Sequence, residues 1–298
     1  MPRIVECIPN FSEGQRPEVI EEILSAVRDT PGCELLDSAP DPSHNRVVVS
    51  FLGEPEAVLE GAFRAMAVAT RLIDMNKHKG EHPRLGATDV VPFVPISEVT
   101  MKECVSLAER LGERVANELA IPVYLYENAA RLPERRNLAD VRRGEYEGLL
   151  QGINEPARKP DIGEAKLHPT AGAVVIGARK PLVAFNVNLG TSDIKIARAI
   201  ARNVRGSSGG FVHVKALGVM LAERNIAQVS MNLVDYEHTS IHHAFEFIKG
   251  EAERYGVSVI GSEIIGLLPM QALIDSALWY LRVEEFDSAQ ILDSRIKG

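Results

Sequence analysis

The chain is poor in cysteine, in aromatic residues and in long apolar runs. Its three cysteines, Cys7, Cys33 and Cys104, are far apart and form no C-x-x-C pair. Neither a disulfide framework nor a thiolate metal site is indicated, so we expect buried or inert thiols. No apolar run is long enough to span a membrane or to serve as a signal peptide. These absences predict a globular protein of the cytoplasm.

A surplus of basic residues is missing as well. The formal net charge of -8 at pH 7 argues against nonspecific nucleic-acid binding, which needs a broad basic surface. An anionic small substrate would need a local basic pocket. The 298 residues exceed a typical single core, so we expect two subdomains with a ligand crevice between them.

Apolar spacing in the first half predicts the order β-α-β-β-α-β. The expected strands are residues 4–9, 33–37, 45–52 and 90–96, and the expected helices are residues 19–27 and 56–75. This is the split β-α-β unit of ferredoxin-like sheets. A further helix at 101–119 and a strand at 123–126 extend it. The charged, Pro- and Gly-bearing segment 131–169 is interpreted as a connection between two halves.

The same order returns after this connection. Strands are expected at residues 182–189, 211–220, 227–234 and 257–264, and helices at 194–204 and 243–255. We therefore predict an α/β (α+β) fold of two ferredoxin-like βαββαβ sandwich subdomains. Their predicted boundaries are 1–178 and 179–298.

Residues 78–82 have the H-x-x-E-H spacing of one class of zinc peptidase. Such a site needs one regular helix, so that both histidines project from the same face. Gly80 weakens a helix here, and Pro83 disfavours the α conformation at His82. We expect no metal, and a zinc hydrolase is kept only as an alternative.

A second pair of histidines four residues apart is His238 and His242. The interpretation favoured for this segment is the start of a surface helix, in which Thr239 or Ser240 accepts backbone N–H bonds. His238 is left open as a pocket residue.

A known family pattern runs through much of the chain. It begins with V-E-C-I-P-N-F-S-E-G at residues 5–14 and H-K-G-E-H-P-R at 78–84, and continues in residues 71–75, 122–126, 144–147, 160–163, 177–180, 184–189 and 225–230. These segments resemble glutamate formiminotransferase, the amino-terminal part of the bifunctional formiminotransferase-cyclodeaminase. The resemblance covers essentially the whole chain.

The resemblance implies a one-carbon-group transferase. Such an enzyme moves a formimino group between N-formimino-L-glutamate and N5 of tetrahydrofolate in histidine degradation. It implies tetrahydrofolate as co-substrate, no metal, a homodimer, and two α/β subdomains flanking the folate site. Because the chain stops at Gly298, we expect no cyclodeaminase domain.

In the family the histidine of K-G-E-H-P-R is the acid/base residue, which maps onto His82. An imidazole with its ordinary pKa of about 6.5 can both take and give a proton near neutral pH, a contribution of roughly 10²- to 10⁴-fold in rate. Glu81 or Asp89 could orient the ring.

The family's folate segment maps onto residues 163–172. Gly163, Pro169 and Gly172 fit the pattern, whereas the side chains between them differ. His168 and Thr170 within the segment and Asp161 before it complete the candidates for folate binding.

Both substrates carry glutamate carboxylates, which require cations. The candidates are Arg46, Arg84 and Arg179, each of which could equally be structural. Asn10, Asn186 and Asn188 could bond the pterin or could serve only the backbone.

Two other functions stay open at the sequence level. One is formyl transfer from N-formylglutamate or 5-formyltetrahydrofolate, which needs almost the same pocket. The other is a folate-binding protein without turnover.

Overall fold

The computed structural model describes residues 2–80 and 82–293. The chain divides into two compact units between Lys180 and Pro181. Each unit contains its own β-sheet and its own hydrophobic core. Within the described residues, no helix combines the length and apolar character that crossing a membrane requires.

The first unit begins with the predicted β-α-β-β-α-β order. Its elements are β1 (Ile4–Cys7), β2 (Asn10–Phe11), α1 (Pro17–Arg28), β3 (Cys33–Asp41), β4 (Arg46–Gly53), α2 (Pro55–Leu72) and β5 (Thr88–Ser97). Strands β1 and β2 lie between β4 and β5 and are antiparallel to both, while β3 pairs with the outer side of β4. This is the strand arrangement of a ferredoxin-like sheet, and the prediction is confirmed.

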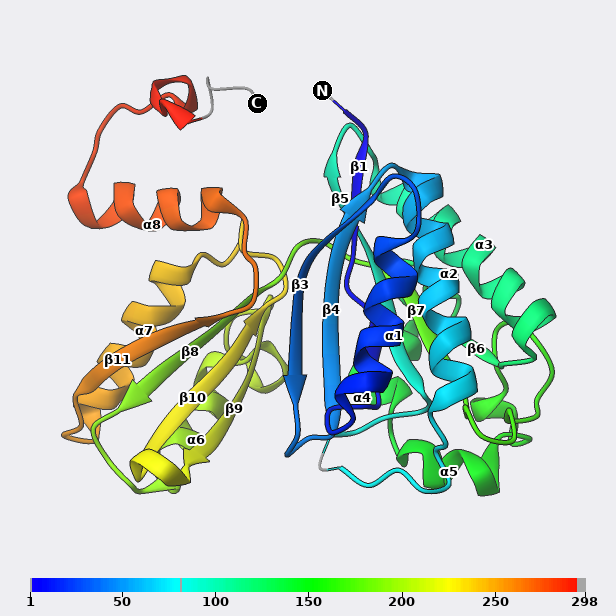
Figure 1. Ribbon diagram of the computed structural model, residues 1–298. Helices are drawn as coiled ribbons and strands as arrows, with labels where there is room; N and C mark the ends of the chain where they lie inside the picture. The colour runs from blue at the N-terminus through cyan, green and yellow to red at the C-terminus, as the bar shows by residue number, and fades with distance from the viewer. Residues whose placement is uncertain (1, 81, 294–298) are drawn as a thin grey trace. The chain divides into compact units, whose positions relative to one another are not determined.

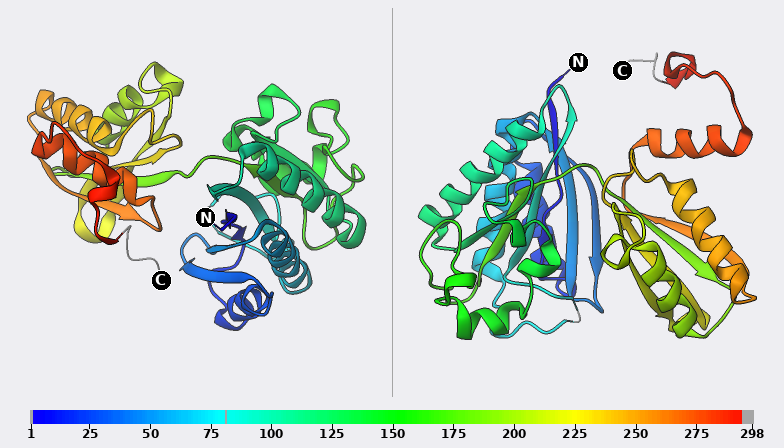
Figure 2. Two further views of the ribbon diagram at one scale, coloured as in Figure 1. Left: turned by 90° about the horizontal axis from the view of Figure 1, so that it is seen from above. Right: turned by 180° about the vertical axis from the view of Figure 1, so that it is seen from behind.

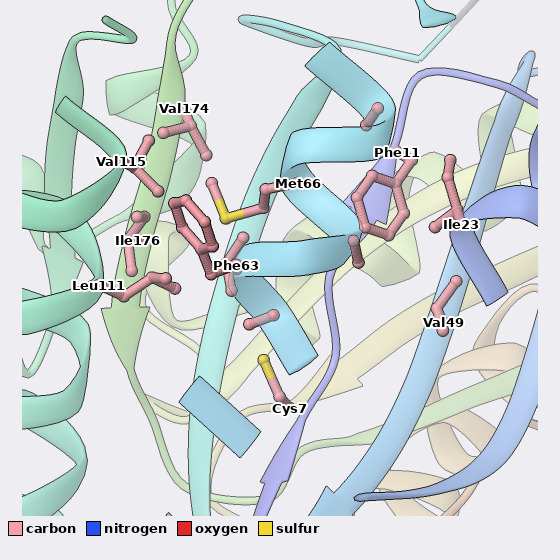
Figure 3. Packing of buried hydrophobic residues seen from close by; sticks show 14 of the residues in the cluster. Cys7, Phe11, Ile23, Val49, Phe63, Met66, Leu111, Val115, Val174 and Ile176 are labelled. Atoms are coloured by element: carbon pink, nitrogen blue, oxygen red, sulfur yellow. The ribbon is translucent and has the colours of Figure 1, made fainter. Parts of the chain in front are cut away.

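Two further strands, β6 (Val123–Glu127) and β7 (Val174–Ala178), widen this sheet, and the helix α3 (Met101–Leu119) precedes them in the chain. Strand β7 lies between β5 and β6 and runs parallel to both. Helices α1, α2 and α3 pack on one face (Figure 1), where Phe63 and Met66 of α2 lie near Val115 of α3 and Ile176 of β7 (Figure 3).

The segment 131–169 is part of this unit, so its interpretation as a connection between halves is wrong. It forms η1 (Pro133–Arg135), α4 (Leu138–Val141), α5 (Glu145–Gly152) and η2 (Pro156–Arg158). Leu149 of α5 packs with Tyr124, Tyr126 and Val175 on the sheet. Arg142 and Glu147 of this segment pair with Asp89 and Arg84 of the unit, so its polar composition does not mark a linker.

The second unit has the predicted order again. Its elements are β8 (Val183–Leu189), α6 (Ile194–Val204), η3 (Gly206–Ser208), β9 (Val214–Leu221), η4 (Ala222–Arg224), β10 (Ile226–Leu233), α7 (Ile241–Arg254) and β11 (Val259–Ile265), followed by α8 (Met270–Leu281) and η5 (Ser288–Gln290). The antiparallel sheet has the order β11-β8-β10-β9. Helices α6 and α7 pack together on one of its faces (Figure 2).

The three cysteines are free thiols, as expected. Cys7 and Cys104 are buried and Cys33 is half-buried. Burial raises the pKa of Cys33 to about 11 and that of Cys104 to about 12, so both thiols are protonated and unreactive at neutral pH.

Candidate active site

His78, His82 and Arg84 lie in the loop between α2 and β5. Helix α2 ends at Leu72, and Ile73 already has an extended backbone. The ring of His78 is engaged on both sides: Nε2 bonds the carbonyl of Asn45 at 3.0 Å, and Nδ1 accepts from Nε of Arg84 at 3.3 Å. None of the described residues from His78 to Arg84 is helical, so they do not form the regular helix that an H-x-x-E-H zinc site requires. The two hydrogen bonds of its ring give His78 a structural role.

Two distant segments of the unit hold this loop in place. On one side, Asn45 of the β3–β4 turn donates from Nδ2 to the carbonyl of Lys79 at 2.9 Å. On the other side, the amide of Met75 donates to the carbonyl of Thr170 at 2.7 Å, and Nδ2 of Asn76 donates to that of Pro169 at 2.8 Å. The first half of the loop, residues 75–79, is therefore held from two sides.

His82 is half-buried among cationic side chains. Burial, followed by the positive charges of Arg46, Arg142 and His44, lowers the pKa of His82 to about 3. The ring of His44 meets that of His82 edge-on, with 6.4 Å between centroids. We call His44, Arg46, His82 and Arg142 the His82 cluster. The imidazole of His82 is therefore neutral at pH 7 and is able to accept a proton.

The two arginines of the His82 cluster have different environments. Arg142 pairs with the carboxylate of Asp89, which also accepts from the amide of Leu85 at 3.0 Å. Among the described residues, Nε of Arg46 is buried without a hydrogen-bond partner. Burial and the charge of Arg142 lower the pKa of Arg46, while Asp89 and Asp41 oppose the shift. Arg46 is the arginine with spare donor capacity for an anion.

Asp89 does not have the orienting role predicted as one alternative, because its oxygens bond Arg142 and Leu85. The other candidate, Glu81, lies outside the described residues.

Arg84 is 7 % exposed and already paired. Nη1 donates to Glu145 and Glu147 at 2.8 Å each, and Nη2 donates to Glu147 at 2.6 Å. These hydrogen bonds to Glu147 raise the pKa of Arg84. With Nε on His78, the guanidinium ties α5 to the loop, whereas its predicted contact with substrate stays a prediction.

Beside Arg84 lies a cavity of about 670 Å³ in the first unit. It is lined by Met75, Asn76, His78, Lys79, Gly80, Arg84, Gly144, Glu145, Tyr146, Glu147 and Leu150. The hydroxyl of Tyr146 donates to Oδ1 of Asn76 at 3.0 Å. Because Asn76 also holds Pro169, one wall of the cavity is fixed to the predicted folate segment.

The predicted folate segment ends in a tight turn from His168 to Gly172. Nδ1 of His168 accepts from the amides of Thr170 and Ala171 at 3.3 and 3.0 Å, and burial lowers the pKa of the ring. Gly172 has a φ of +73°, and a Cβ there would lie 2.5 Å from the carbonyl of Leu85. Gly163 has a φ of +88°. Gly163 and Gly172, which belong to the family pattern, therefore both have a backbone conformation that favours glycine.

The remaining candidates of the first unit lie elsewhere. Asp161 forms a buried ion pair with Arg135 at 2.6 Å and accepts from the amide of Leu125. The side chain of Asn10 donates to the carbonyl of Ile8 at 3.2 Å. Arg179 follows β7 and, like Arg142, acts electrostatically on Tyr126, whose pKa burial raises to about 12. Arg179 and Arg142 thus both lie within electrostatic reach of Tyr126.

Sequence reasoning missed His44 and Arg142. Arg142 stood in a segment interpreted as a connection, and His44 in a turn-rich stretch. Each reaches His82 only through long-range packing, for which a single sequence carries no local signal.

The second unit contains the other histidines. The ring of His242 stacks on Trp279 with 5.0 Å between centroids. The predicted cap is wrong in detail: Ser240 is the N-cap of α7, but its hydroxyl bonds the rings of His242 and His243, not the backbone. Among the described residues, one group could hold a metal ion, namely His213, Asp235 and His238, with ligand atoms within 4.8 Å of one another. It does not include His82.

The two amides of β8 belong to the second sheet. Asn188 donates from Nδ2 to Glu263 at 3.0 Å and accepts from Gln228 at 2.8 Å. Asn186 is buried beside it. Both residues are built into the sheet, and their predicted contacts with a ligand stay predictions.

Two family models match the chain. Residues 4–179 match the formiminotransferase domain, N-terminal subdomain, and residues 184–296 match the formiminotransferase domain. The chain is 54% identical to a glutamate formimidoyltransferase of Streptococcus pyogenes serotype M1, over 100% of both chains. It is 45% identical to a glutamate formimidoyltransferase of Thermoplasma acidophilum, covering 99% of this chain and 97% of that one. It is also 47% identical to the formimidoyltransferase-cyclodeaminase of Mus musculus, covering 96% of this chain and 54% of that protein.

Proposed function

Because the chain belongs to the formiminotransferase family, we propose that it transfers a formimino group between N-formimino-L-glutamate and N5 of tetrahydrofolate. The resemblance predicted from the sequence is thereby confirmed. The observation that carries the proposal is His82, which is half-buried and is kept neutral by burial and by the charges of Arg46 and Arg142. Tetrahydrofolate is the co-substrate, and histidine degradation is the pathway in which the family acts.

A neutral imidazole suits the first proton transfer. N5 of tetrahydrofolate attacks the formimino carbon, and the nitrogen must lose its proton as the new bond forms. His82 accepts that proton as a general base. Since the arginines lower its pKa, bound carboxylates that neutralise them bring the pKa back toward neutrality.

The cations of the His82 cluster supply the anion-binding capacity that a chain of net charge -8 otherwise lacks. Arg46 offers its unpartnered Nε, and its fork geometry matches a carboxylate. Arg179, which like Arg142 acts electrostatically on Tyr126, is a second candidate for a glutamate carboxylate. Arg84 holds α5 against the loop and positions the site through His78.

We assign the folate to the segment 163–172 and the adjoining cavity. The turn at His168–Gly172 is tied to the His82 loop through Asn76, so a pterin bound there lies near the reacting group. Gly163, Pro169 and Gly172 shape the backbone of this segment, while His168 and Thr170 provide its polar atoms. Asp161 stabilises the start of the segment by pairing with Arg135.

The competing candidates are formyl transfer and folate binding without turnover. A formyl donor differs from a formimino donor only in O against NH at the reacting carbon. The deciding experiment measures 5-formiminotetrahydrofolate formation from tetrahydrofolate and N-formimino-L-glutamate, with N-formyl-L-glutamate as a parallel donor. His82→Ala should lose roughly 10²- to 10⁴-fold in rate.

Each alternative has its own result in that assay. Turnover with the formyl donor alone would replace the formimino assignment. Retained folate binding without turnover of either donor would favour a binding protein. An unchanged rate in His82→Ala would remove the acid/base assignment.

We further propose that the protein acts as a homodimer in the cytoplasm, and that residues 1–178 and 179–298 are its functional subdomains. The ligand crevice between them stays a prediction from the sequence. Mass measurement in solution tests the dimer.

A further inference from the structure

His44 is a second imidazole beside His82. Its Nδ1 lies 2.6 Å from Oδ2 of Asp41, and its ring meets that of His82 edge-on. Among the described residues, none hydrogen-bonds the Nε2 atom of His44. The turn that carries it is held by Asn45, whose Oδ1 accepts from the amide of Gly14 at 2.9 Å.

Asp41 is built to hold the imidazole of His44. Its Oδ1 accepts from the amides of Ser43 and His44 at 3.0 Å each, which leaves Oδ2 for the ring. Burial alone would raise the pKa of Asp41, but the backbone and ring hydrogen bonds of His44 and the amide of Ser43 lower it. A carboxylate on Nδ1 fixes the ring orientation and leaves Nε2 as the nitrogen that exchanges protons.

The two imidazoles have opposite surroundings. His82 is half-buried beside Arg46 and Arg142, whereas His44 is 45 % exposed on its side chain and faces a carboxylate. Among the described residues, Asp89 is a second acidic group near the His82 cluster, and its carboxylate pairs with Arg142. Two titratable groups placed in opposed environments divide the acid and base roles of a reaction.

We propose that His44, oriented by Asp41, donates the proton that the departing glutamate amine needs, while His82 accepts the proton of N5. This inference rests on the proposed formimino transfer and assigns a catalytic residue that the family resemblance does not provide. It replaces one histidine acting twice with two histidines acting once each.

The step balances in atoms and charge. The C–N bond between the formimino carbon and N5 forms, and the N5 proton passes to Nε2 or Nδ1 of His82. The C–N bond to glutamate breaks, its electron pair stays on nitrogen, and that nitrogen takes a proton from Nε2 of His44. The enzyme is left with a protonated His82 and a neutral His44, and proton exchange with solvent restores both.

The test measures kcat and KM for 5-formiminotetrahydrofolate formation in wild type, His44→Gln, Asp41→Asn and His44→Ala. His243→Gln is the matched control, because His243 is exposed and lies in the second unit, where it bonds Ser240 and its ring contacts those of His242 and Trp279. We expect kcat of His44→Gln to fall about 100-fold with KM little changed. Asp41→Asn should fall about 10-fold, and the control should keep the wild-type rate.

Added imidazole separates a proton donor from a structural side chain. It should restore turnover in His44→Ala in proportion to its protonated fraction, because it can enter the exposed site and give the same proton. Urea unfolding of each variant checks that the fold is kept.

The outcomes are distinct. A wild-type kcat in His44→Gln overturns this inference alone. So does a loss of turnover that added imidazole does not restore and that equally weakened tetrahydrofolate binding explains. A wild type that forms no product overturns the proposed function and the inference with it. A loss confined to kcat together with imidazole rescue supports both.

Discussion

Asp89 of β5 and Arg142 after α4 form an ion pair although they stand 53 positions apart in the sequence. The carboxylate is 2 % exposed and the guanidinium 13 %. The pair joins the central sheet to the segment that covers its second face. It also places a fixed positive charge beside His82.

Asp89→Asn should destabilise the protein. It leaves Arg142 buried without its counter-charge, and breaking a buried pair on one side costs about 3 kcal/mol. The free energy of unfolding in urea measures the effect. The control is Asp140→Asn, whose partner Arg143 is exposed, and there we expect a loss of less than about 1 kcal/mol. Equal losses at both sites would contradict the structural role of the Asp89 pair.

Arg46→Met should raise the pKa of His82 above its value of about 3, because after burial the charge of Arg46 lowers this pKa most. Arg142→Met should shift it in the same direction. Titration of the His82 ring signals by NMR measures the pKa directly. Arg143→Met is the control, since Arg143 is exposed and pairs with Asp140. A pKa of His82 that stays unchanged in both cluster variants would contradict this electrostatic assignment.

Acid should destabilise the protein partly through His82. The ring has a pKa of about 3 in the folded state against an ordinary 6.5, so the unfolded state binds more protons between these values. The contribution of His82 to the free energy of unfolding is therefore fully present above pH 6.5 and is lost as the pH drops toward 3. His82→Gln should lose less stability than wild type between pH 7 and pH 4.5 in urea unfolding. Parallel curves for the two proteins would rule out this contribution.

Gly172→Ala should impair both stability and folate binding. The residue has a φ of +73°, and the new Cβ would meet the carbonyl of Leu85 at 2.5 Å. Gly209→Ala is the matched control, because its φ is +94° but nothing lies within 4 Å of the added Cβ. The control should cost about 1 kcal/mol through backbone strain alone and leave folate binding unchanged. Gly172→Ala should cost more and weaken tetrahydrofolate binding in calorimetry. Similar results for both glycines would remove the special role of the turn.

Periodicity predicted the helices and alternating strands such as β3 and β9, because each of them buries one face. The buried strands β5 and β6 were predicted from their apolar runs instead. Neither signal predicted β7, whose short run Val174–Ala178 is buried along its whole length. Such a run does not alternate and carries no strand period. The charged segment 131–169 was misinterpreted as a connection for a different reason. Its composition is polar, but arginines such as Arg142 pair with partners far away in the sequence.

The candidate site was likewise predictable from the sequence only in part. His82 was found through a motif shared with a family, and His78 was set aside because Gly80 and Pro83 oppose a helix. In contrast, the pairing of Asp161 with Arg135 and of Arg142 with Asp89 depends on tertiary packing. A cation that is consumed by an internal partner looks the same in sequence as one that is free to bind a substrate.

Asn45 serves three parts of the first unit at once: its side chain bonds Gly14 and Lys79, and its carbonyl bonds His78. Its backbone has a φ of +48°, which asparagine tolerates better than most residues. The length of the β3–β4 turn is therefore tied to the length of the loop that carries His82. An insertion in either one would move His44 and His82 apart, so evolution or a designer must change the two loops together.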